Sequence, residues 1–363
     1  MSTLAAIAVL ALLIFVHELG HFVAARSQGI HVNRFSIGFG PILWKYQGAE
    51  TEYAIRGIPL GGFVGFPDDD PDSKIPPNDP NLLRNRPVLD RAIVISAGVI
   101  ANLVFAYLLL AFQVGAVGIP HLDYQPGVLV PQVAPEASAA AVKAGIKPGD
   151  VILAANGQAL GASKDALPNL MKTIQDSPGK PIEFRIQRRA EQLSVQVTPE
   201  LSEDGKSRIG VQLAPNGKVL RQRTRNLVEV FTTAAGEFQR IILLTVQGFG
   251  QLISNFKETA NQVSGPVAIV AIGAGIARTD WASLLQFGAL ISINLAILNI
   301  LPLPALDGGQ LAFLLIEGVR GKPLPTRIQD GVMQTGLMLL LGLGVFLIVR
   351  DTANLEWVQK LFQ

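Results

Sequence analysis

The stretch from Leu4 to Ala25, LAAIAVLALLIFVHELGHFVAA, decides the interpretation of this chain because it joins an apolar run of membrane length to a metal-binding pattern. His17 and His21 are four positions apart, so a helix places both imidazoles on one face, where they can hold one zinc ion. Glu18 is the only residue between these limits that is charged at neutral pH with the histidines neutral, and it is free to act as general base on a metal-bound water. Ionisable groups at membrane depth cost about 3 kcal/mol or more each and usually mark function, so the sequence predicts a zinc site inside a bilayer.

The composition points to the same environment. The chain has 363 residues, of which 49% are hydrophobic and 16% charged, and its mean hydropathy is +0.37. These values are typical of a polytopic membrane protein. The net charge of +2 gives no argument for nucleic acid as a partner. Cysteine is absent, so a metal must be held by His, Asp or Glu side chains.

Four apolar segments are long enough to cross a membrane, and they lie at about 4–25, 92–114, 283–300 and 333–349. The third segment continues as an apolar run beyond Pro302 and Pro304 to about residue 316. As one helix from Trp281 to Gly318 it would be about 57 Å long, which exceeds a bilayer core of about 30 Å. The two prolines are therefore expected to break this helix.

The distribution of basic residues predicts the orientation. Loop 26–91 contains eight Lys and Arg residues and no basic residue precedes the first span, so we expect the loop in the cytoplasm. An even number of spans then puts both termini and segment 115–225 on the extracytoplasmic side. The first span lacks a basic n-region and is longer than a signal-peptide core, so we expect it to be retained. No transit peptide precedes it, which favours a bacterial inner (plasma) membrane over a plastid.

The fold class expected is a polytopic α-helical membrane protein with a membrane-associated β-hairpin region and one inserted extracytoplasmic α+β domain. Residues 1–114 form an N-terminal membrane part that contains the HExxH helix, a β-rich loop at 30–66 and the second span. Residues 115–225 have the composition of a soluble domain with its linker. Residues 226–363 begin with an amphipathic helix, to about residue 260, and continue as the C-terminal membrane part.

The β-rich loop at 30–66 alternates polar and apolar residues and is punctuated by glycines. A half-apolar hairpin so close to a membrane site could offer its edge to an extended peptide. A plain surface hairpin explains the same pattern equally well, so both interpretations stay open.

A catalytic zinc ion needs a third protein ligand and one open position. His31 lies in the β-rich loop and His121 on the opposite side of the membrane, so both are poor candidates. Glu50 and Glu52 are near in sequence but belong to a polar hairpin. Asp307 is the better choice, because it follows the prolines that unwind the third segment and precedes two glycines that allow close backbone approach. A divalent cation also offsets the cost of an unpaired aspartate in a membrane.

With HExxH at His17–His21 and NILPLPALDGG at Asn299–Gly309, this chain resembles the site-2 protease family of intramembrane zinc metalloproteases. Ile58–Phe63 is similar to the membrane-associated β loop of that family. Ser96–Asn102 is similar to its second-span motif, except that the fourth residue is Val where proline is usual. Residues 124–200 resemble a bacterial PDZ domain. A single PDZ domain resembles the shorter bacterial and plastid members, whereas the enterobacterial sigma-E-regulating branch has two.

The resemblance implies a role for each matching residue. His17, His21 and Asp307 would hold zinc, and Glu18 would activate the attacking water. Contact with the substrate is implied for Asn299, Pro302, Pro304, Asn102 and Asn294. The asparagines in this set are equally explained by hydrogen bonds between membrane helices.

The implied activity is zinc-dependent cleavage within or near the membrane helix of single-span substrates, with anti-sigma factors and remnant signal peptides as the expected classes. The PDZ domain would either bind a newly exposed C-terminus or act as a size filter. Two hypotheses from other classes remain: a membrane PDZ scaffold with a vestigial metal site, and a transporter that relays protons through the intramembrane His and Asp. The intact motifs argue against the first, and the absence of an inverted sequence repeat argues against the second.

Overall fold

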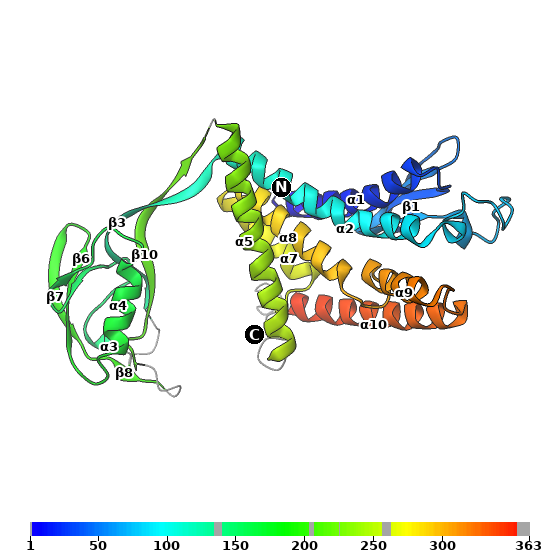
Figure 1. Cartoon of the computed structure of the whole chain (residues 1–363). Helices are drawn as coiled ribbons and strands as arrows, with labels where there is room; N and C mark the ends of the chain where they lie inside the picture. Colours follow the sequence, from blue (N-terminus) through cyan, green and yellow to red (C-terminus); the bar gives the residue numbers. More distant parts are fainter. Residues whose placement is uncertain (1, 134–139, 203–206, 225, 256–262, 354–363) are drawn as a thin grey trace. The chain divides into compact units, whose positions relative to one another are not determined.

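A computed structural model gives the fold and describes residues 2–133, 140–202, 207–224, 226–255 and 263–353. The chain forms two compact units, which we call the membrane unit (1–117 with 223–363) and the inserted unit (118–222). The inserted unit falls inside the predicted domain segment 115–225. Figure 1 shows the helices and strands of both units.

Four helices among the described residues are long and apolar enough to cross a membrane, and this agrees with the number predicted. They are α1 (Ser2–Ser27), α2 (Val88–Phe112), α8 (Ser283–Ile300) and α10 (Thr326–Ala353). A π-helical turn, η3 (Gln113–Val117), continues α2. Both α2 and α10 begin before the predicted segments, because polar residues at a membrane edge extend a helix beyond the apolar run that hydropathy detects.

The apolar run after α8 breaks where the prolines predicted a break. The last residue of α8 is Ile300, residues 301–306 are not helical, and α9 (Asp307–Arg320) begins directly after them. Proline lacks the backbone N–H that would continue the α8 hydrogen-bond ladder. An ion pair between Arg91 and Glu317 joins the end of α9 to the beginning of α2.

The sequence analysis did not predict α7 (Pro266–Thr279), a shorter apolar helix that packs on α1. Its first residue is a proline, which favours a helix start. The carboxylate of Asp351 on α10 accepts a hydrogen bond from the backbone N–H of Ala268 at 3.0 Å and so caps this helix. No sequence pattern reveals this cap, because 83 residues separate its two partners.

The predicted β-rich loop contains two long strands, β1 (Arg34–Gln47) and β2 (Glu52–Gly65). Each strand folds into two paired segments. Residues 34–37 run parallel to residues 52–55 on one side, and on the other side they meet residues 62–65 in the opposite direction. Residues 44–47 pair with the far side of residues 52–55. The loop is therefore a sheet of four segments rather than a single hairpin, and the segment 62–65 forms one edge.

Glycines and one aspartate shape the chain around this sheet. Gly38 and Gly40 have φ values of +87° and +79°, and they bend β1 through the left-handed region that glycine adopts freely. After β2, Asp68 accepts hydrogen bonds from the backbone N–H groups of Leu83 at 3.1 Å and Arg84 at 3.0 Å. These bonds order the polar loop, which includes the 3-10 helices η1 (Pro67–Asp69) and η2 (Leu83–Asn85).

The amphipathic helix predicted from residue 226 is α5 (Leu227–Ser254), which packs on α2 and α8. Val230, Ala234 and Ile241 are buried at helical spacing and join a core with apolar residues of both neighbours. The last predicted residues of this helix lie outside the described part of the chain.

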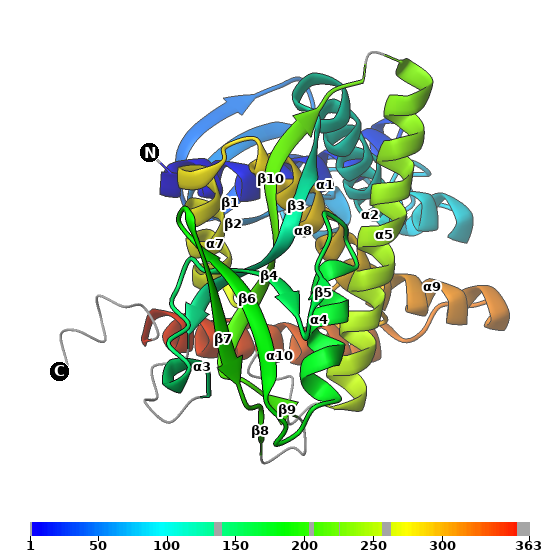
Figure 2. The same ribbon diagram turned by 90° about the vertical axis from the view of Figure 1, so that its left-hand side faces the viewer.

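The inserted unit is built on an antiparallel sheet with strand order β10-β3-β4-β6-β7, and β5 pairs with β4. Figure 2 views this sheet with α4 beside it. Phe184, Ile152 and Leu170 are fully buried in its core. The elements are β3 (Ile119–Val133), α3 (Ala140–Lys143), β4 (Val151–Ala155), β5 (Gln158–Ala159), α4 (Ala166–Gln175), β6 (Ile182–Arg188), β7 (Glu191–Val197), β8 (Glu200–Leu201), β9 (Ser207–Arg208) and β10 (Val211–Gln222).

Local sequence signals located most of these elements. Apolar spacing in this part of the sequence predicts a helix at about 164–176 and strands at 181–187 and 192–198. The structure places α4, β6 and β7 there to within two residues. The Asn156-Gly157 turn joins β4 to β5 with φ values of +49° and +76°, as such a hairpin turn requires. The sequence also predicts a short helix at 137–143, and the structure describes this stretch only from Ala140 onward.

Candidate metal centre

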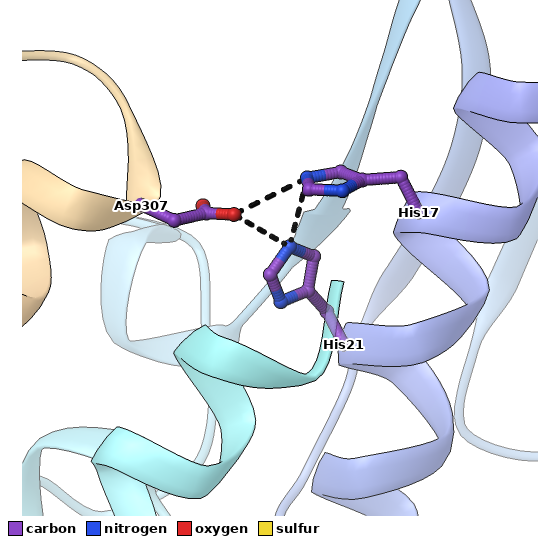
Figure 3. Close-up of side chains that lie close together, drawn as sticks. All are labelled: His17, His21 and Asp307. Atoms are coloured by element: carbon purple, nitrogen blue, oxygen red, sulfur yellow. Dashed lines mark hydrogen bonds and ion pairs between the residues drawn. The ribbon is translucent and has the colours of Figure 1, made fainter. Parts of the chain in front are cut away.

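Two histidines and one aspartate meet inside the membrane unit, as Figure 3 shows. His17 and His21 extend from α1, and Asp307 is the first residue of α9. The Nε2 atoms of the two histidines are 3.2 Å apart. Oδ2 of Asp307 lies 3.3 Å from His17 Nε2 and 3.4 Å from His21 Nε2. Within the described chain, these three side chains are the group close enough to share a metal ion.

These three ligand atoms fit a zinc ion. Tetrahedral zinc lies about 2.0 to 2.2 Å from nitrogen and oxygen ligands, which places the ligand atoms about 3.3 to 3.5 Å from one another. The three observed separations are close to that range, and three protein ligands leave a fourth position for a water or substrate atom. Oδ2 of Asp307 is buried and makes no hydrogen bond. Such an orphaned carboxylate oxygen is costly unless a cation lies beside it.

A backbone carbonyl fixes the direction in which the imidazole of His21 faces. Its Nδ1 atom lies 2.8 Å from the carbonyl oxygen of Val94 on α2, so Nδ1 carries the proton and donates it. Nε2 then keeps its lone pair for the metal. This contact on the far side of the ring is the kind that orients metal-binding histidines.

Asn102 of α2 is the corresponding partner of His17. The structure has the amide nitrogen of this fully buried residue 3.3 Å from Nδ1 of His17, and it leaves the amide oxygen buried without a hydrogen bond. When Nε2 of His17 holds a metal, Nδ1 carries a proton and needs a hydrogen-bond acceptor. An amide nitrogen at this position is also a donor, so two donors would face each other. The oxygen and nitrogen of an amide are assigned from its hydrogen bonds, so a metal at Nε2 would require the Asn102 amide to be turned with its oxygen toward His17.

Gly98 lies between these two contacts, because residues 94, 98 and 102 are spaced four apart and share one face of α2. A Cβ atom on Gly98 would lie 2.7 Å from Cε1 of both His17 and His21. Glycine at this position therefore makes the space that both imidazoles occupy against α2.

Glu18 lies between the metal centre and one edge of the β-sheet. A Cβ atom on Gly62, in the edge segment 62–65, would lie 2.8 Å from Cγ of Glu18. A single carboxylate thus borders both the ligand triangle and a strand edge that can hold extended backbone.

The loop before Asp307 is tightly folded. Ala305 has a φ of +67°, which is rare for a residue with a side chain and is a form of strain found at functional sites. A Cβ atom on Gly308 would lie 2.5 Å from the carbonyl carbon of Ile300, and one on Gly309 would lie 3.1 Å from a carbonyl carbon of the loop. The two glycines let the loop fold back on the beginning of α9, and this fold holds the carboxylate of Asp307 toward α1.

The asparagines of the third and second spans occupy different places. The amide nitrogen of Asn299 lies 3.3 Å from Nε2 of His17, on the metal side of the ring. Asn294 accepts a hydrogen bond from the hydroxyl of Thr245 on α5 at 2.9 Å, away from the triangle. The structure therefore brings Asn102 and Asn299 to the histidines, and it places Asn294 between two helices.

The two prolines of the unwound segment also differ. Pro302 is exposed, whereas Pro304 packs against α10 at Gly336. A Cβ atom on Gly336 would lie 2.8 Å from the carbonyl carbon of Pro304. This close approach connects the loop before the third ligand to the last span.

The residues rejected as ligands lie elsewhere. His31 is 3.7 Å from a carboxylate oxygen of Asp79, Glu50 is paired with Arg26, and Glu52 is 3.0 Å from Lys45. His121 belongs to β3 of the inserted unit.

Sequence reasoning did not identify Val94, Gly98 and Gly62 as parts of the site. Gly98 and Asn102 have a small-xxx-polar spacing, which is a signal for close helix approach in membranes. Val94 contributes only its backbone carbonyl and Gly62 only its missing side chain, so the tertiary structure alone reveals their part.

Comparison with known proteins identifies the family of this chain. Residues 5–343 match the model of peptidase family M50. A Nostoc sp. protein named "Putative zinc metalloprotease" is 70% identical over 100% of both chains. The "Membrane metalloprotease ARASP, chloroplastic" of Arabidopsis thaliana is 50% identical and covers 99% of this chain and 80% of the relative. The "Regulator of sigma-E protease RseP" of Salmonella typhimurium is 31% identical over 93% of this chain and 96% of the relative.

Among solved structures, the PDZ domain of an SdrC-like protein from Listeria monocytogenes matches 24% of this chain and 86% of its own. Its identity is 19% and its TM-score is 0.21, and a likeness at that level carries no argument.

Proposed function

The chain belongs to peptidase family M50, the site-2 protease family, and is a multi-pass membrane zinc metalloendopeptidase; from that premise we propose that it cuts substrates at His17, His21 and Asp307. The observation that carries the proposal is the triangle of ligand atoms, with sides of 3.2, 3.3 and 3.4 Å, on a membrane-spanning helix. Glu18 borders the triangle, so a ligand set and a candidate base lie together at membrane depth.

Each residue of the centre has its own task. When bound, zinc supplies a Lewis acid that polarises a carbonyl and lowers the pKa of a water molecule to about 7. Glu18 takes a proton from the attacking water and passes it to the leaving amine. Asn299 presents its amide nitrogen to the same side of His17 and can donate to the substrate carbonyl oxygen as negative charge develops there.

The edge segment 62–65 is the proposed holder of the substrate backbone. A membrane helix hides its peptide bonds in internal hydrogen bonds, so it must unwind locally before water can attack. An unwound segment can pair with a free sheet edge, where main-chain hydrogen bonds give affinity. Gly62 lies beside Glu18, which would place a paired substrate strand next to the proposed base. Exposed Pro302 and the packed Pro304 are proposed to border the same strand.

The proposed substrates are single-span membrane proteins, of which anti-sigma factors and remnant signal peptides are the leading classes. A relative named as a regulator of sigma-E protease supports the first class. The excess of Lys and Arg in loop 26–91 supports a cytoplasmic position for that loop, with both termini and the inserted unit outside.

We propose that the inserted unit is a PDZ domain that recognises or filters substrates. A cavity of about 610 Å³ lies between α4, which contributes Met171 and Ile174, and the chain from Ser207 to Leu213. β10 is an edge strand of its sheet, so an extended peptide in this cavity could add to it. Gly210 has a φ of +75° at the beginning of this segment, a conformation that leaves a turn beside the cavity.

The direct test is cleavage of a fusion protein with one transmembrane helix and a short external stub, in liposomes, by the wild type and by Glu18→Gln. The wild type should cut within the helix in a zinc-dependent manner, and Glu18→Gln should be slower by about 10² to 10⁴-fold, the usual contribution of a general base. Equal cleavage rates for the wild type and Glu18→Gln would show that Glu18 is not the general base. No cutting by either protein, across several helix sequences, would favour a scaffold.

The two tasks of the inserted unit are separable with a variant in its cavity. Met171→Glu should abolish cutting of a trimmed substrate if the cavity binds the new C-terminus. The same variant should leave cutting unchanged if the unit is a size filter. In the filter case, deletion of residues 124–200 should permit cutting of a substrate with an intact external domain.

A further inference from the structure

A second hollow of the membrane unit lies outside the ligand triangle. It is a groove of about 620 Å³ between the loop before Asp307 and α10. The loop contributes Leu303 and Pro304, and α10 contributes one face from Arg327 to Leu340. We call this hollow the α10 groove. Its wall is apolar apart from Arg327 and Thr335.

Two features make the α10 groove suitable for a hydrocarbon chain. The hydroxyl of Thr335 donates a hydrogen bond to the carbonyl oxygen of Gly331 in its own helix at 2.8 Å. It therefore needs no hydrogen-bond partner from a molecule in the groove. A Cβ atom on Gly331 would have no neighbour within 4 Å, which shows that the groove is open at this residue. Ile328 and Val332 are exposed beside it.

The mouth of the groove lies at the level of lipid headgroups. Residues 331–349 of α10 carry no charged side chain. As a helix they span about 28 Å, close to a bilayer core of about 30 Å. Arg327 lies just beyond this segment. The ion pair of Arg91 with Glu317 ties the neighbouring end of α9 to the beginning of α2, so the mouth is on the side of loop 26–91.

The charge at this mouth is positive and unpaired. Arg320, Lys322 and Arg327 lie within eight residues of one another, and the described structure shows an ion pair for none of the three. Asp330 does not line the groove, and Glu317 before Arg320 is already paired with Arg91. Three cations against one anion leave a net charge of +2 where phosphate groups of a membrane lie.

We propose that the α10 groove binds one anionic phospholipid of this leaflet, with an acyl chain along the groove and the phosphate at Arg327 and Lys322. A membrane protein helix could fill the apolar wall, but it would leave the cations without a partner. A phospholipid supplies in one molecule an acyl chain for the apolar wall and a phosphate for the cations. Since Leu303 and Pro304 form the opposite wall, the bound chain packs against the loop that leads to the third metal ligand.

The test uses the full-length protein in nanodiscs of phosphatidylcholine that contain a small fraction of a photoactivatable lipid. The probe is phosphatidylglycerol or phosphatidylcholine with the same diazirine-labelled acyl chain, and mass spectrometry maps the cross-linked residues. Phosphatidylglycerol should label the face of α10 between residues 327 and 340 more strongly. Each basic residue at an anionic surface is worth about fivefold, or about 1 kcal/mol.

Two variants and two matched controls locate the site. Arg327→Gln should lower labelling by the phosphatidylglycerol probe about fivefold. Gly331→Leu should lower labelling by both probes, because the side chain fills the groove. Lys74→Gln removes a basic residue on the same side of the membrane, and Gly342→Leu adds the same side chain on α10 outside the groove; neither should change the labelling. Zinc content of each purified variant checks that the membrane unit is folded.

Three results would overturn the proposal. One is equal labelling of the wild type by the two lipid probes. Another is equal labelling of Arg327→Gln and Lys74→Gln. The third is displacement of both probes by a single-span substrate with no effect of Arg327→Gln, which would make the groove a protein-binding surface instead.

Discussion

The inserted unit and the membrane unit place apolar and polar side chains in opposite ways. In the inserted unit, Phe184 and Ile152 are fully buried. In the membrane unit, Met338 and Val349 of α10 are 76% and 63% exposed, whereas Asn102 is fully buried. The difference follows from the solvent: water drives apolar side chains inward, but lipid does not, so membrane helices pack through small and polar residues.

The two units also differ in how they treat a buried carboxylate. In the inserted unit, Asp150 accepts two hydrogen bonds from Arg188 at 2.8 Å and one from the backbone N–H of Lys147 at 2.8 Å. In the membrane unit, Oδ2 of Asp307 is buried without any hydrogen bond. A satisfied carboxylate stabilises a fold, while an orphaned one fits a site that binds a cation.

Loss of a proposed metal ligand should produce the largest difference between the units. His21→Ala removes one corner of the ligand triangle, so zinc affinity should fall by more than about 100-fold, beyond the loss from a supporting residue. Metal content by mass spectrometry and hydrogen exchange of residues 118–222 measure the two units in one sample. The exchange of the inserted unit should not change. A zinc content equal to that of the wild type would contradict the assignment of the triangle.

The reverse experiment removes a core side chain from the inserted unit. Phe184→Ala should destabilise this unit by about 3 to 5 kcal/mol, the usual cost of a large cavity in a core. Hydrogen exchange of the full-length protein should show this loss, with zinc content unchanged. Arg185→Ala on the exposed side of the same strand is the control, and its effect should stay within about 0.5 kcal/mol. A comparable loss of stability in Phe184→Ala and Arg185→Ala would show that burial of Phe184 in the core does not stabilise the inserted unit.

The partner of His17 offers a finer test of the membrane unit. Asn102→Leu removes the acceptor for Nδ1 of His17 and should weaken zinc binding about 10 to 100-fold, as loss of a supporting hydrogen bond does. Asn102→Asp keeps an oxygen toward the ring and should bind zinc more tightly than the leucine variant. Competition with a chelator of known affinity measures both. If Asp and Leu weaken binding equally, the amide oxygen does not face His17.

The smallest expected effect is a pH dependence in the inserted unit. Burial would raise the pKa of Asp150, but hydrogen bonds from Arg188 and the backbone of Lys147 outweigh it and lower the pKa below its usual value. A carboxylate with a lowered folded pKa contributes stability that is present above the unfolded pKa of about 3.9 and is lost as pH falls through the folded value. Asp150→Asn should therefore cost about 1 to 2 kcal/mol at neutral pH.

Hydrogen exchange at pH 7 and at about pH 3 checks this expectation, because the difference between wild type and Asp150→Asn should shrink at the lower pH. A difference that grows as the pH falls would reverse the sign of the linkage and contradict the pairing with Arg188.

Local patterns predicted the parts of the fold that a short window can specify. The length of each apolar run located α1, α2, α8 and α10, and the Asn156-Gly157 turn and the alternating strands located part of the inserted unit. Local sequence patterns did not predict structure that depends on contacts between residues far apart in the chain. The helix α7 is capped by Asp351 from another span, and the four-segment sheet depends on a pairing of residues 34–37 with two different partners.

The sequence by itself determined that this chain spans a membrane and that His17, Glu18 and His21 share one helix face, because helical spacing and hydropathy are local properties. It also singled out Asp307, since a lone carboxylate after two prolines in an apolar run needs a compensating cation. Only the tertiary structure decided that Asp307 meets the histidines across 286 residues (307 − 21), and that Gly98 makes room for both rings. Those contacts arise from helix packing, where a missing Cβ or a buried carbonyl decides the geometry and leaves no periodic trace in the sequence.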